Sequence, residues 1–152
     1  MRIIILAAAS FSLFLFTSCN NEDQQETGKS ENNIDAARNF IRAALDGKFD
    51  QARQYLFIDS VNTNWMDIAE RSYAKNDQSV KDGYRSASIN IHKVNKLNDS
   101  TTVIIYSNSY KNDHDTLKVL KVSNQWLVDL KYLFEHDADT LTVKPLTNDT
   151  LK

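Results

Sequence analysis

From residue 34 onward, the apolar residues of the first half of the chain recur at the spacing of an amphipathic helix. A first helix over about residues 35–46 has an inward stripe of Ile34, Ala37, Phe40, Ile41, Ala44 and Leu45. Asp35 is placed to cap its start, and Gly47 stands where a helix ends in the left-handed conformation. A shorter second helix, capped by Asp50, turns Phe49, Ala52, Tyr55 and Leu56 inward. The pattern therefore predicts a helical hairpin.

A third helix is predicted directly after Asn64. Its inward stripe consists of Trp65, Ile68, Ala69 and Tyr73. The polar residues 76–78 end this helix, so three helices are expected before the first strand.

The apolar period changes from helical to alternating near residue 87. Ile89 and Ile91 share one parity and Val94 the other, which predicts a β-bulge near His92 or Lys93. Residues 101–110 are apolar on both parities, as in a central strand with both faces covered, and further strands are expected over residues 117–122 and 126–134. Short polar turns at 98–100, 112–115 and 123–124 make the sheet an antiparallel meander. Helices followed by strands predict an α+β domain, with N-terminal helices packed on a curved four-stranded antiparallel sheet.

The N-terminus carries a different pattern, an almost wholly apolar run over residues 3–16 that follows Arg2. The run is shorter than the roughly 20 residues that a membrane span needs, and it has the parts of a secretory signal. Thr17-Ser18-Cys19 resembles the end of a bacterial lipoprotein signal, although Phe16 stands where leucine is usual. Cys19, the single cysteine, cannot form an internal disulfide and lies in polar surroundings. We expect it to be lipidated and to become the first residue after removal of residues 1–18, and the alternative is an uncleaved helical anchor.

Residues 19–34 have almost no apolar side chain and are expected to form a flexible acidic tether. The folded domain is predicted over residues 35–134, and residues 135–152 are predicted to be a polar tail. The alternative for this tail is an edge strand that includes Leu141 and Val143. Glu22-Asp23 resembles an export signal that some Gram-negative lipoproteins carry after the lipidated cysteine, and an ordinary spacer explains it equally well. The expected location is the outer membrane of a Gram-negative cell, on its periplasmic or external face, with the lipid as the membrane contact.

Charge and composition exclude two classes of partner. The formal net charge of −2 becomes −3 once Arg2 is removed, and no Lys/Arg cluster faces an aromatic platform, so nucleic-acid binding is not expected. The three glycines, at positions 28, 47 and 83, form no phosphate-binding loop. Seven Phe, six Tyr and two Trp are instead typical of a folded core.

Two segments carry a resemblance to a known family. Residues 40–52 with Tyr55-Leu56 resemble the opening of the nuclear transport factor 2-like, or cystatin-like, superfamily, and residues 126–130 fit its closing strand. Together with the lipoprotein signal, the chain is similar to an uncharacterised lipoprotein branch sometimes labelled lumazine-binding-like. The resemblance covers residues 35–134 and implies a sheet wrapped around a long helix, with a cone-shaped pocket lined by aromatic residues. Enzymes of the superfamily place an Asp, His or Tyr inside that cone.

The candidate pocket residues are Tyr55, Tyr73, Tyr106 and Trp126, with Asp59 or Asp67 approaching from nearby. The competing interpretation is that the aromatic residues fill the core and that the aspartates cap helices. No spacing pairs these residues into a catalytic set, so we expect no enzymatic activity.

Metal binding and cofactors are not expected either. His92, His114 and His136 are spread over a strand, a turn and the tail, which is not a zinc pattern. Residues 113–115 (Asp-His-Asp) and 137–139 (Asp-Ala-Asp) lack the glycine and glutamate of an EF-hand loop.

A tripeptide of Asp, then Ser or Thr, then an aliphatic residue or Thr occurs five times, where composition predicts about one. It resembles the acceptor of O-linked glycans on exported proteins in one group of Gram-negative bacteria. The candidate acceptors are Ser60, Ser100, Thr116, Thr140 and Thr150. Strand entries after turns generate the same tripeptide, so both explanations stay open.

The expected function is therefore non-catalytic binding by a lipid-anchored envelope domain, of a small apolar or aromatic molecule in the cone or of an envelope protein on the sheet. The first alternative is a small isomerase- or dehydratase-like enzyme that uses the cone, and the second is an immunity-type or interaction partner with a filled pocket. A closed, Phe-filled cone would exclude both small-molecule functions, and an Asp or His facing an open cone would favour the enzyme.

Overall fold

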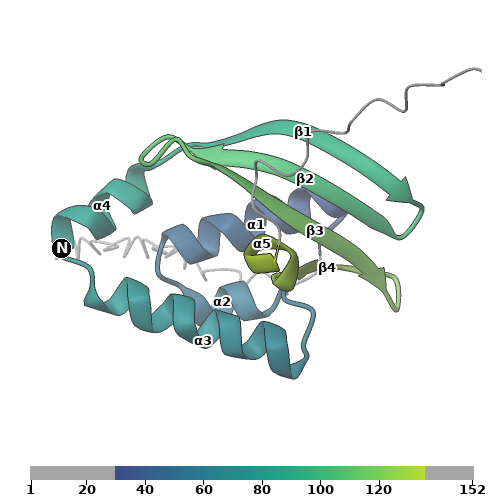
Figure 1. Cartoon of the computed structure of the whole chain (residues 1–152), viewed down its shortest axis with the longest axis horizontal. Coiled ribbons are helices and arrows are strands. Elements are labelled where there is room, and N and C mark those ends of the chain that lie inside the picture. Colours follow the sequence, from purple (N-terminus) through teal and green to yellow (C-terminus); the bar gives the residue numbers. More distant parts are fainter. Residues whose placement is uncertain (1–29, 136–152) are drawn as a thin grey trace, which may run out of the picture.

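The computed structural model describes residues 30–135 of the chain. Its elements follow in the order α1 (Asn33–Leu45), α2 (Phe49–Arg53), α3 (Ser60–Lys75), α4 (Gln78–Ser86), β1 (Ile89–Asn98), β2 (Thr101–Asn108), β3 (His114–Val122), β4 (Gln125–Asp129) and α5 (Lys131–Glu135) (Figure 1). Helices come first and an antiparallel sheet follows. The α+β fold class predicted from the sequence is confirmed.

The sheet is a meander of strand order β1-β2-β3-β4, with every neighbouring pair antiparallel. The pairing of β1 with β2 shifts between Ile91 and Lys93, where the change of apolar phase predicted a bulge. Ser123 and Asn124 both have positive φ, 49° and 65°, as the tight turn between β3 and β4 requires. These local signals were correct because turn residues and alternation act within a few residues of the chain.

The fourth strand is shorter than predicted. β4 pairs with β3 only from Val122↔Gln125 to Lys118↔Asp129, and the chain then turns into α5 instead of continuing to residue 134. α5 contacts β3, so a single helical turn lies beside that strand. The alternation over residues 130–134 was too short to distinguish a strand from one turn of helix.

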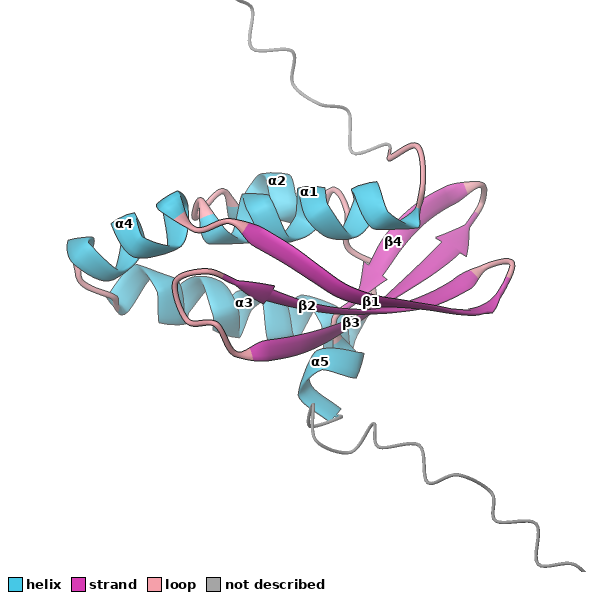
Figure 2. Cartoon of the chain, turned by 90° about the horizontal axis from the view of Figure 1, so that it is seen from above, coloured by secondary structure: helices cyan, strands magenta, loops and turns pink. Residues whose placement is uncertain are grey.

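The core lies between α1 and one face of the curved sheet (Figure 2). α1 contacts all four strands and also α2. Phe40 and Ile41 of α1 belong to one buried cluster with strand residues that have no exposed surface, namely Ile104, Leu117, Val119 and Val128. Each large apolar side chain buried in this way stabilises the fold by about 1.5–3 kcal/mol.

The starts of the first two helices differ from the prediction. Asn32 caps α1, since its side-chain oxygen accepts hydrogen bonds from the backbone N–H groups of Ile34 (2.9 Å) and Asp35 (3.0 Å). The folded domain therefore extends into the range predicted as tether. Asp50 lies in the first turn of α2 after the cap position, Lys48, and does not cap the helix. Gly47, with φ 76°, ends α1 as predicted.

The third helix starts earlier than predicted, because Asp59 caps α3 through the Asn62 backbone N–H (2.8 Å). The longer helix buries Asn62 and Met66 most deeply, whereas Ile68 is 38% exposed. Trp65, Ala69 and Tyr73 are half-buried and pack at the edge of the core. The predicted stripe was wrong at Ile68 because the buried face includes a polar residue, which an apolar pattern does not reveal.

The sequence did not predict α4. This helix buries none of its residues, and two of its apolar side chains, Val80 and Tyr84, lie four residues apart. The Arg42 guanidinium of α1 instead holds its C-terminal end, donating to the carbonyl oxygens of Ala87 (2.8 Å) and Tyr84 (3.1 Å). The Tyr84 carbonyl oxygen also accepts the Ala87 backbone N–H (3.2 Å), and the guanidinium adds a charged donor at a helix end where carbonyl oxygens lack regular helical partners.

Several predictions fall outside the described residues. They are the signal over residues 1–18, Cys19, most of the tether, and the edge strand at Leu141 and Val143. Within residues 30–135, no helix combines the length and apolar character that crossing a membrane requires.

Candidate functional site

A cavity of about 360 Å³ opens between the helices and the β2–β3 end of the sheet. Its apolar part is lined from α1, α2, α3, α5 and the segment before α5 by Phe40, Ile41, Ala44, Leu45, Phe49, Met66, Ala69, Leu130 and Leu133. Its polar part is lined by Tyr84, Tyr106, Asn108, Lys111, Asp113 and Asp115. Lys111 and Asp113 are exposed, so the polar part forms the open end. The cavity thus has an apolar floor and a polar mouth, as small-molecule sites commonly do.

Tyr106 and Asp115 are direct cross-strand partners on β2 and β3, and both side chains line the cavity. Cross-strand partners have their Cβ atoms about 4.5–5.5 Å apart, so the phenol and the carboxylate are neighbours. Among residues 30–135, neither side chain forms a hydrogen bond or an ion pair. Their polar atoms are not among the fully buried unpartnered atoms of this part of the chain, so they face the open cavity and are available to a ligand.

The surroundings of this pair shift both pKa values upward. Burial raises the pKa of Asp115, the nearby Asp113 carboxylate raises it further, and Lys111 and His114 oppose the shift. Burial also raises the pKa of Tyr106, with a smaller contribution from the charge of Asp115. Tyr106 is therefore a neutral hydrogen-bond donor at neutral pH. A ligand that brings a hydrogen-bond donor or a positive charge would stabilise the ionised form of the Asp115 carboxyl.

The remaining mouth residues have partners of their own. A hydrogen bond with the Tyr84 side chain raises the pKa of Lys111. The Asn108 side chain accepts from the backbone N–H groups of Tyr110 (3.2 Å) and Lys111 (3.0 Å), which fixes the loop after β2. The rings of Tyr84 and Tyr110 meet edge to face at 5.1 Å. The mouth is therefore held in shape from α4 and from the β2–β3 loop.

Of the four aromatic residues predicted at the pocket, Tyr106 lines the cavity. Tyr55 is 1% exposed within the core, and Tyr73 packs edge-on against the Phe49 ring at 5.5 Å behind the lining. Trp126 lies on β4 with the Lys121 ammonium 5.5 Å from its ring centre. These three side chains do not line this cavity.

The two aspartates predicted near the pocket do not line the cavity. Asp59 caps α3 and pairs with Lys131 (2.7 Å). The backbone N–H of Asn62 lowers the pKa of Asp59 most strongly, and Lys131 adds to this shift. Asp67 pairs with Arg53 (2.9 Å), which also pairs with Glu70. Asp59 is therefore a helix cap, as the competing interpretation expected, whereas Asp67 lies within α3 and forms an ion pair.

Asp115 was missed because it lay in a predicted turn. β3 begins at His114, three residues before the predicted strand start. The β2–β3 hairpin contained a usable signal, since pairing the apolar residues Ile104 and Leu117 places Tyr106 opposite Asp115. Extending that register by two residues would have identified the pair.

The candidate glycan acceptors have different environments. Ser60 and Ser100 are exposed at the start of α3 and in the β1–β2 turn. Thr116 is 2% exposed within β3, so the folded domain has no room for a glycan there. Thr140 and Thr150 lie outside the described residues. For Thr116, the strand-entry explanation of the tripeptide is the better one.

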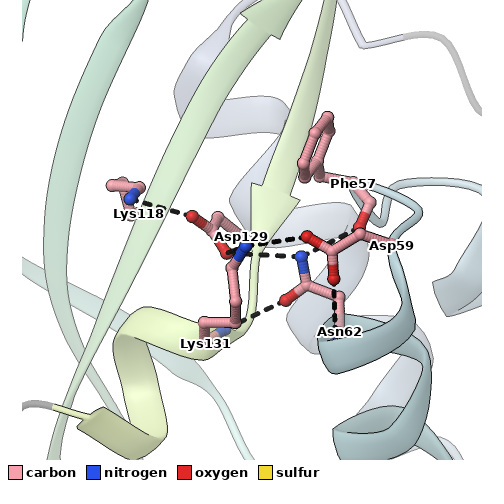
Figure 3. Close-up of polar contacts among 6 residues, drawn as sticks. All are labelled: Phe57, Asp59, Asn62, Lys118, Asp129 and Lys131. Atoms are coloured by element: carbon pink, nitrogen blue, oxygen red, sulfur yellow. Dashed lines mark hydrogen bonds and ion pairs between the residues drawn. The ribbon is translucent and has the colours of Figure 1, made fainter.

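A second polar cluster lies around the end of β4 (Figure 3). The side chain of Asp129, 4% exposed, receives the Lys118 ammonium at 2.8 Å, the Asn62 amide at 3.3 Å and the Lys131 ammonium at 3.9 Å. Burial of a carboxylate in this position is tolerable because three donors surround it. We refer to Asp129, Lys118, Lys131 and Asn62 as the Asp129 network.

Asn62 connects this network to the backbone (Figure 3). Its amide donates to the Phe57 carbonyl oxygen (2.9 Å), and its side-chain oxygen accepts from the Lys131 backbone N–H (3.0 Å). The network therefore joins the start of α3, the end of β4 and the start of α5. Because every member is already bonded, its role is structural.

The fold and cavity together define an α+β domain with one hollow end. No known protein family matches the chain, and no curated protein matches it. Among solved structures, the chain is similar to an NTF-2 like protein of unknown function from Shewanella oneidensis MR-1. The two share 12% sequence identity with a TM-score of 0.47, over 62% of this chain and 89% of the other. This similarity identifies no ligand or activity.

Proposed function

We propose that the domain binds a small, mostly apolar molecule in the cavity, with the polar end of that molecule at Tyr106 and Asp115. The observation that carries the proposal is the unpartnered phenol and carboxylate pair inside a cavity of about 360 Å³ with an apolar floor. This volume lies at the lower end of the range of about 300–1,000 Å³ typical of ligand sites.

A binding function without chemistry is the simplest use of this geometry. An apolar floor supplies affinity through burial, and two polar groups supply orientation. Catalysis would need a further group placed against the reacting atoms, and among residues 30–135 no side chain hydrogen-bonds to Asp115 or Tyr106 to orient either one. The open cavity also supports a small molecule over a partner protein with a filled pocket.

The raised pKa of Asp115 favours acid–base catalysis as a second candidate function. A carboxylate whose pKa is shifted upward by burial is a stronger base than an exposed one, and the neighbouring Tyr106 phenol would donate to a developing oxyanion. This is the arrangement that an isomerase or dehydratase would need. Turnover of a bound ketone or β-hydroxy compound, lost in Asp115→Asn, would establish the enzyme in place of the binding protein.

Filling the cavity tests the proposal directly. Ala69 of α3 lines the cavity, and Ala74 of the same helix is exposed. Ala69→Leu should weaken binding of the neutral fluorescent probe N-phenyl-1-naphthylamine by about 10-fold or more, because the added carbons take the space of the probe. Ala74→Leu is the matched control and should bind the probe as the unmodified chain does.

Fluorescence titration of the detergent-solubilised full chain measures both affinities. Equal affinity in Ala69→Leu and Ala74→Leu would show that the probe binds elsewhere and would contradict the proposal. Native mass spectrometry of the same preparation would identify a co-purified ligand, and its mass should disappear in Ala69→Leu.

The lipid anchor at Cys19 is part of the proposed function, supported by the sequence of residues 1–19. One acyl chain holds a protein only marginally, at about 0.8 kcal/mol per buried methylene, so stable anchoring takes two or more chains. Cys19→Ser should move the protein from the detergent phase to the aqueous phase on phase separation. An N-terminal peptide of the unmodified chain without acyl mass would contradict the anchor.

A further inference from the structure

Two histidines that are far apart in the sequence lie against each other on the exposed side of the sheet. His92 is the bulge residue of β1, His114 is the first residue of β3, and both are exposed. Their ring centres are 4.3 Å apart, with the ring planes at 44°. The sequence analysis predicted them on separate elements with no shared role. In the folded sheet they come together across β2.

The face that carries them is opposite to the cavity. Side chains alternate across a strand, so Ser107 points away from the face on which its neighbour Tyr106 lines the cavity. Ser107 pairs with His114 across β2 and β3, and its hydroxyl is 2.8 Å from Nε2 of His92. The two rings therefore flank Ser107, and the proposed ligand cavity does not include them.

The spacing of the rings suits a shared metal ion. With a metal–nitrogen bond of about 2.0–2.1 Å and about 1.2 Å from nitrogen to ring centre, two imidazoles on one metal have centres about 4.5–5 Å apart. The observed 4.3 Å is close to that separation before any metal binds. Rotation of the exposed rings is the adjustment that binding requires.

The hydrogen bond to Ser107 also prepares His92. If Nε2–H donates to the Ser107 hydroxyl, the lone pair of Nδ1 is left for a metal, and the ring is held in place. The ring nitrogens of His114 have no hydrogen-bond partner among residues 30–135. In the same part of the chain, no three His, Cys, Asp or Glu side chains gather around one point, so water would complete the coordination.

We propose that His92 and His114 together bind a divalent transition-metal ion on this face of the sheet. Imidazole nitrogens suit copper, nickel and zinc, and affinities for such ligands rise to Cu²⁺ and fall at Zn²⁺. The site therefore binds Cu²⁺ most tightly. It lies on a surface that is open to the surrounding solution.

Titration of the detergent-solubilised, untagged full chain with CuSO₄ tests this site, with glycine present as a competing chelator. Loss of an outer-shell partner typically weakens a metal site by about 10–100-fold, so loss of a ligand in His92→Ala or His114→Ala should weaken Cu²⁺ binding at least as much. Electron paramagnetic resonance of the unmodified chain should show splitting from two nitrogens. His136→Ala is the matched control and should bind as the unmodified chain does.

His114 is exposed, so His114→Ala should leave the urea midpoint without metal unchanged, whereas His92→Ala also removes the partner of the buried Ser107 hydroxyl and should lower that midpoint slightly. With Cu²⁺ in excess, the midpoint of the unmodified chain should rise, and that of the two variants should not. Unchanged affinity in either variant, or equal weakening in His136→Ala, would overturn the two-histidine site.

Discussion

Asp129→Ala is expected to lower the free energy of unfolding by about 3 kcal/mol, because it leaves two ammonium groups and the Asn62 amide without their shared acceptor. Breaking a fully buried pair costs about 3–5 kcal/mol, and the lower end applies here since Lys118 and Lys131 are each more than a quarter exposed. Urea unfolding, followed by circular dichroism, measures the change.

Asp99→Ala is the control for that experiment. Asp99 pairs with Lys96 at a similar distance, 2.9 Å, but its side chain is fully exposed in the β1–β2 turn. Solvent screens such a pair and the long lysine side chain loses entropy in it, so the midpoint should move only slightly. The contrast between the two variants isolates burial, because charge and residue type are the same.

A double variant separates the charge from the shape of the Asp129 network. Replacing a buried ion pair by apolar residues of similar volume is often close to neutral, so Lys118→Met with Asp129→Leu should recover part of the stability lost in Asp129→Ala. An Asp129→Ala variant as stable as the unmodified chain would show that the network does not hold β4, α3 and α5 together.

The elements that were predicted correctly are those fixed by nearby residues. Alternating apolar positions gave the meander, and the phase change at Val94 gave the bulge between Ile91 and Lys93. Gly47 ended α1 because φ 76° suits glycine, and a Cβ there would lie 2.5 Å from a Tyr73 ring carbon. The bulge and the positive φ at Gly47 are local backbone features, whereas the Tyr73 contact is a tertiary one and the residue that caps α1 was not predicted.

The elements that were missed depend on tertiary contacts. α4 is held by Arg42 from α1, 42 residues away in the sequence, and its local signal is confined to the four-residue spacing of Val80 and Tyr84. The burial of Asn62 depends on Asp129 and on the Lys131 backbone, both nearly 70 residues further along. Propensity and periodicity carry no information about such partners.

The candidate site shows the same division. An aromatic lining with Tyr106 was predicted from the family resemblance, whereas Asp115 required the register of the β2–β3 hairpin. The contact between His92 and His114 required the positions of three strands at once. The sequence alone shows which residue types are present, and the strand register determines which of their side chains are in contact.

Asp115→Asn is expected to weaken the binding of a cationic ligand and, at pH 7, to raise the free energy of unfolding. In the unmodified chain, 1-naphthylmethylammonium should bind more tightly than 1-naphthalenemethanol, and 1-naphthoate should bind least, because Asp115 and Asp113 outnumber Lys111 at the cavity mouth. A charge-assisted hydrogen bond contributes about 1.5–3 kcal/mol, so the variant should lose about 10–100-fold in affinity for the ammonium ligand alone.

The pH dependence of stability follows from the raised pKa of Asp115. A carboxyl whose pKa is higher in the folded than in the unfolded chain favours folding while protonated, and that contribution is lost as pH rises through the folded pKa. At pH 7, Asp115→Asn should therefore be more stable than the unmodified chain, by roughly 0.5–1 kcal/mol, the gain of a typical stabilising substitution. The gain should disappear below the unfolded value of 3.8, where Asp115 is protonated in both states.

Asp99→Asn supplies a control of opposite sign for this experiment. Lys96 lowers the pKa of Asp99, so this carboxylate favours folding above its unfolded pKa, and the contribution is lost as pH falls through the folded value. Urea midpoints of the three chains at pH 7 and pH 3 give both signs in one measurement. If Asp115→Asn is less stable than the unmodified chain at pH 7, the carboxylate has a partner that stabilises its charge. That result would contradict binding of a cationic ligand at Asp115, because the positive end of the ligand is expected to be the partner that the carboxylate lacks in the free protein.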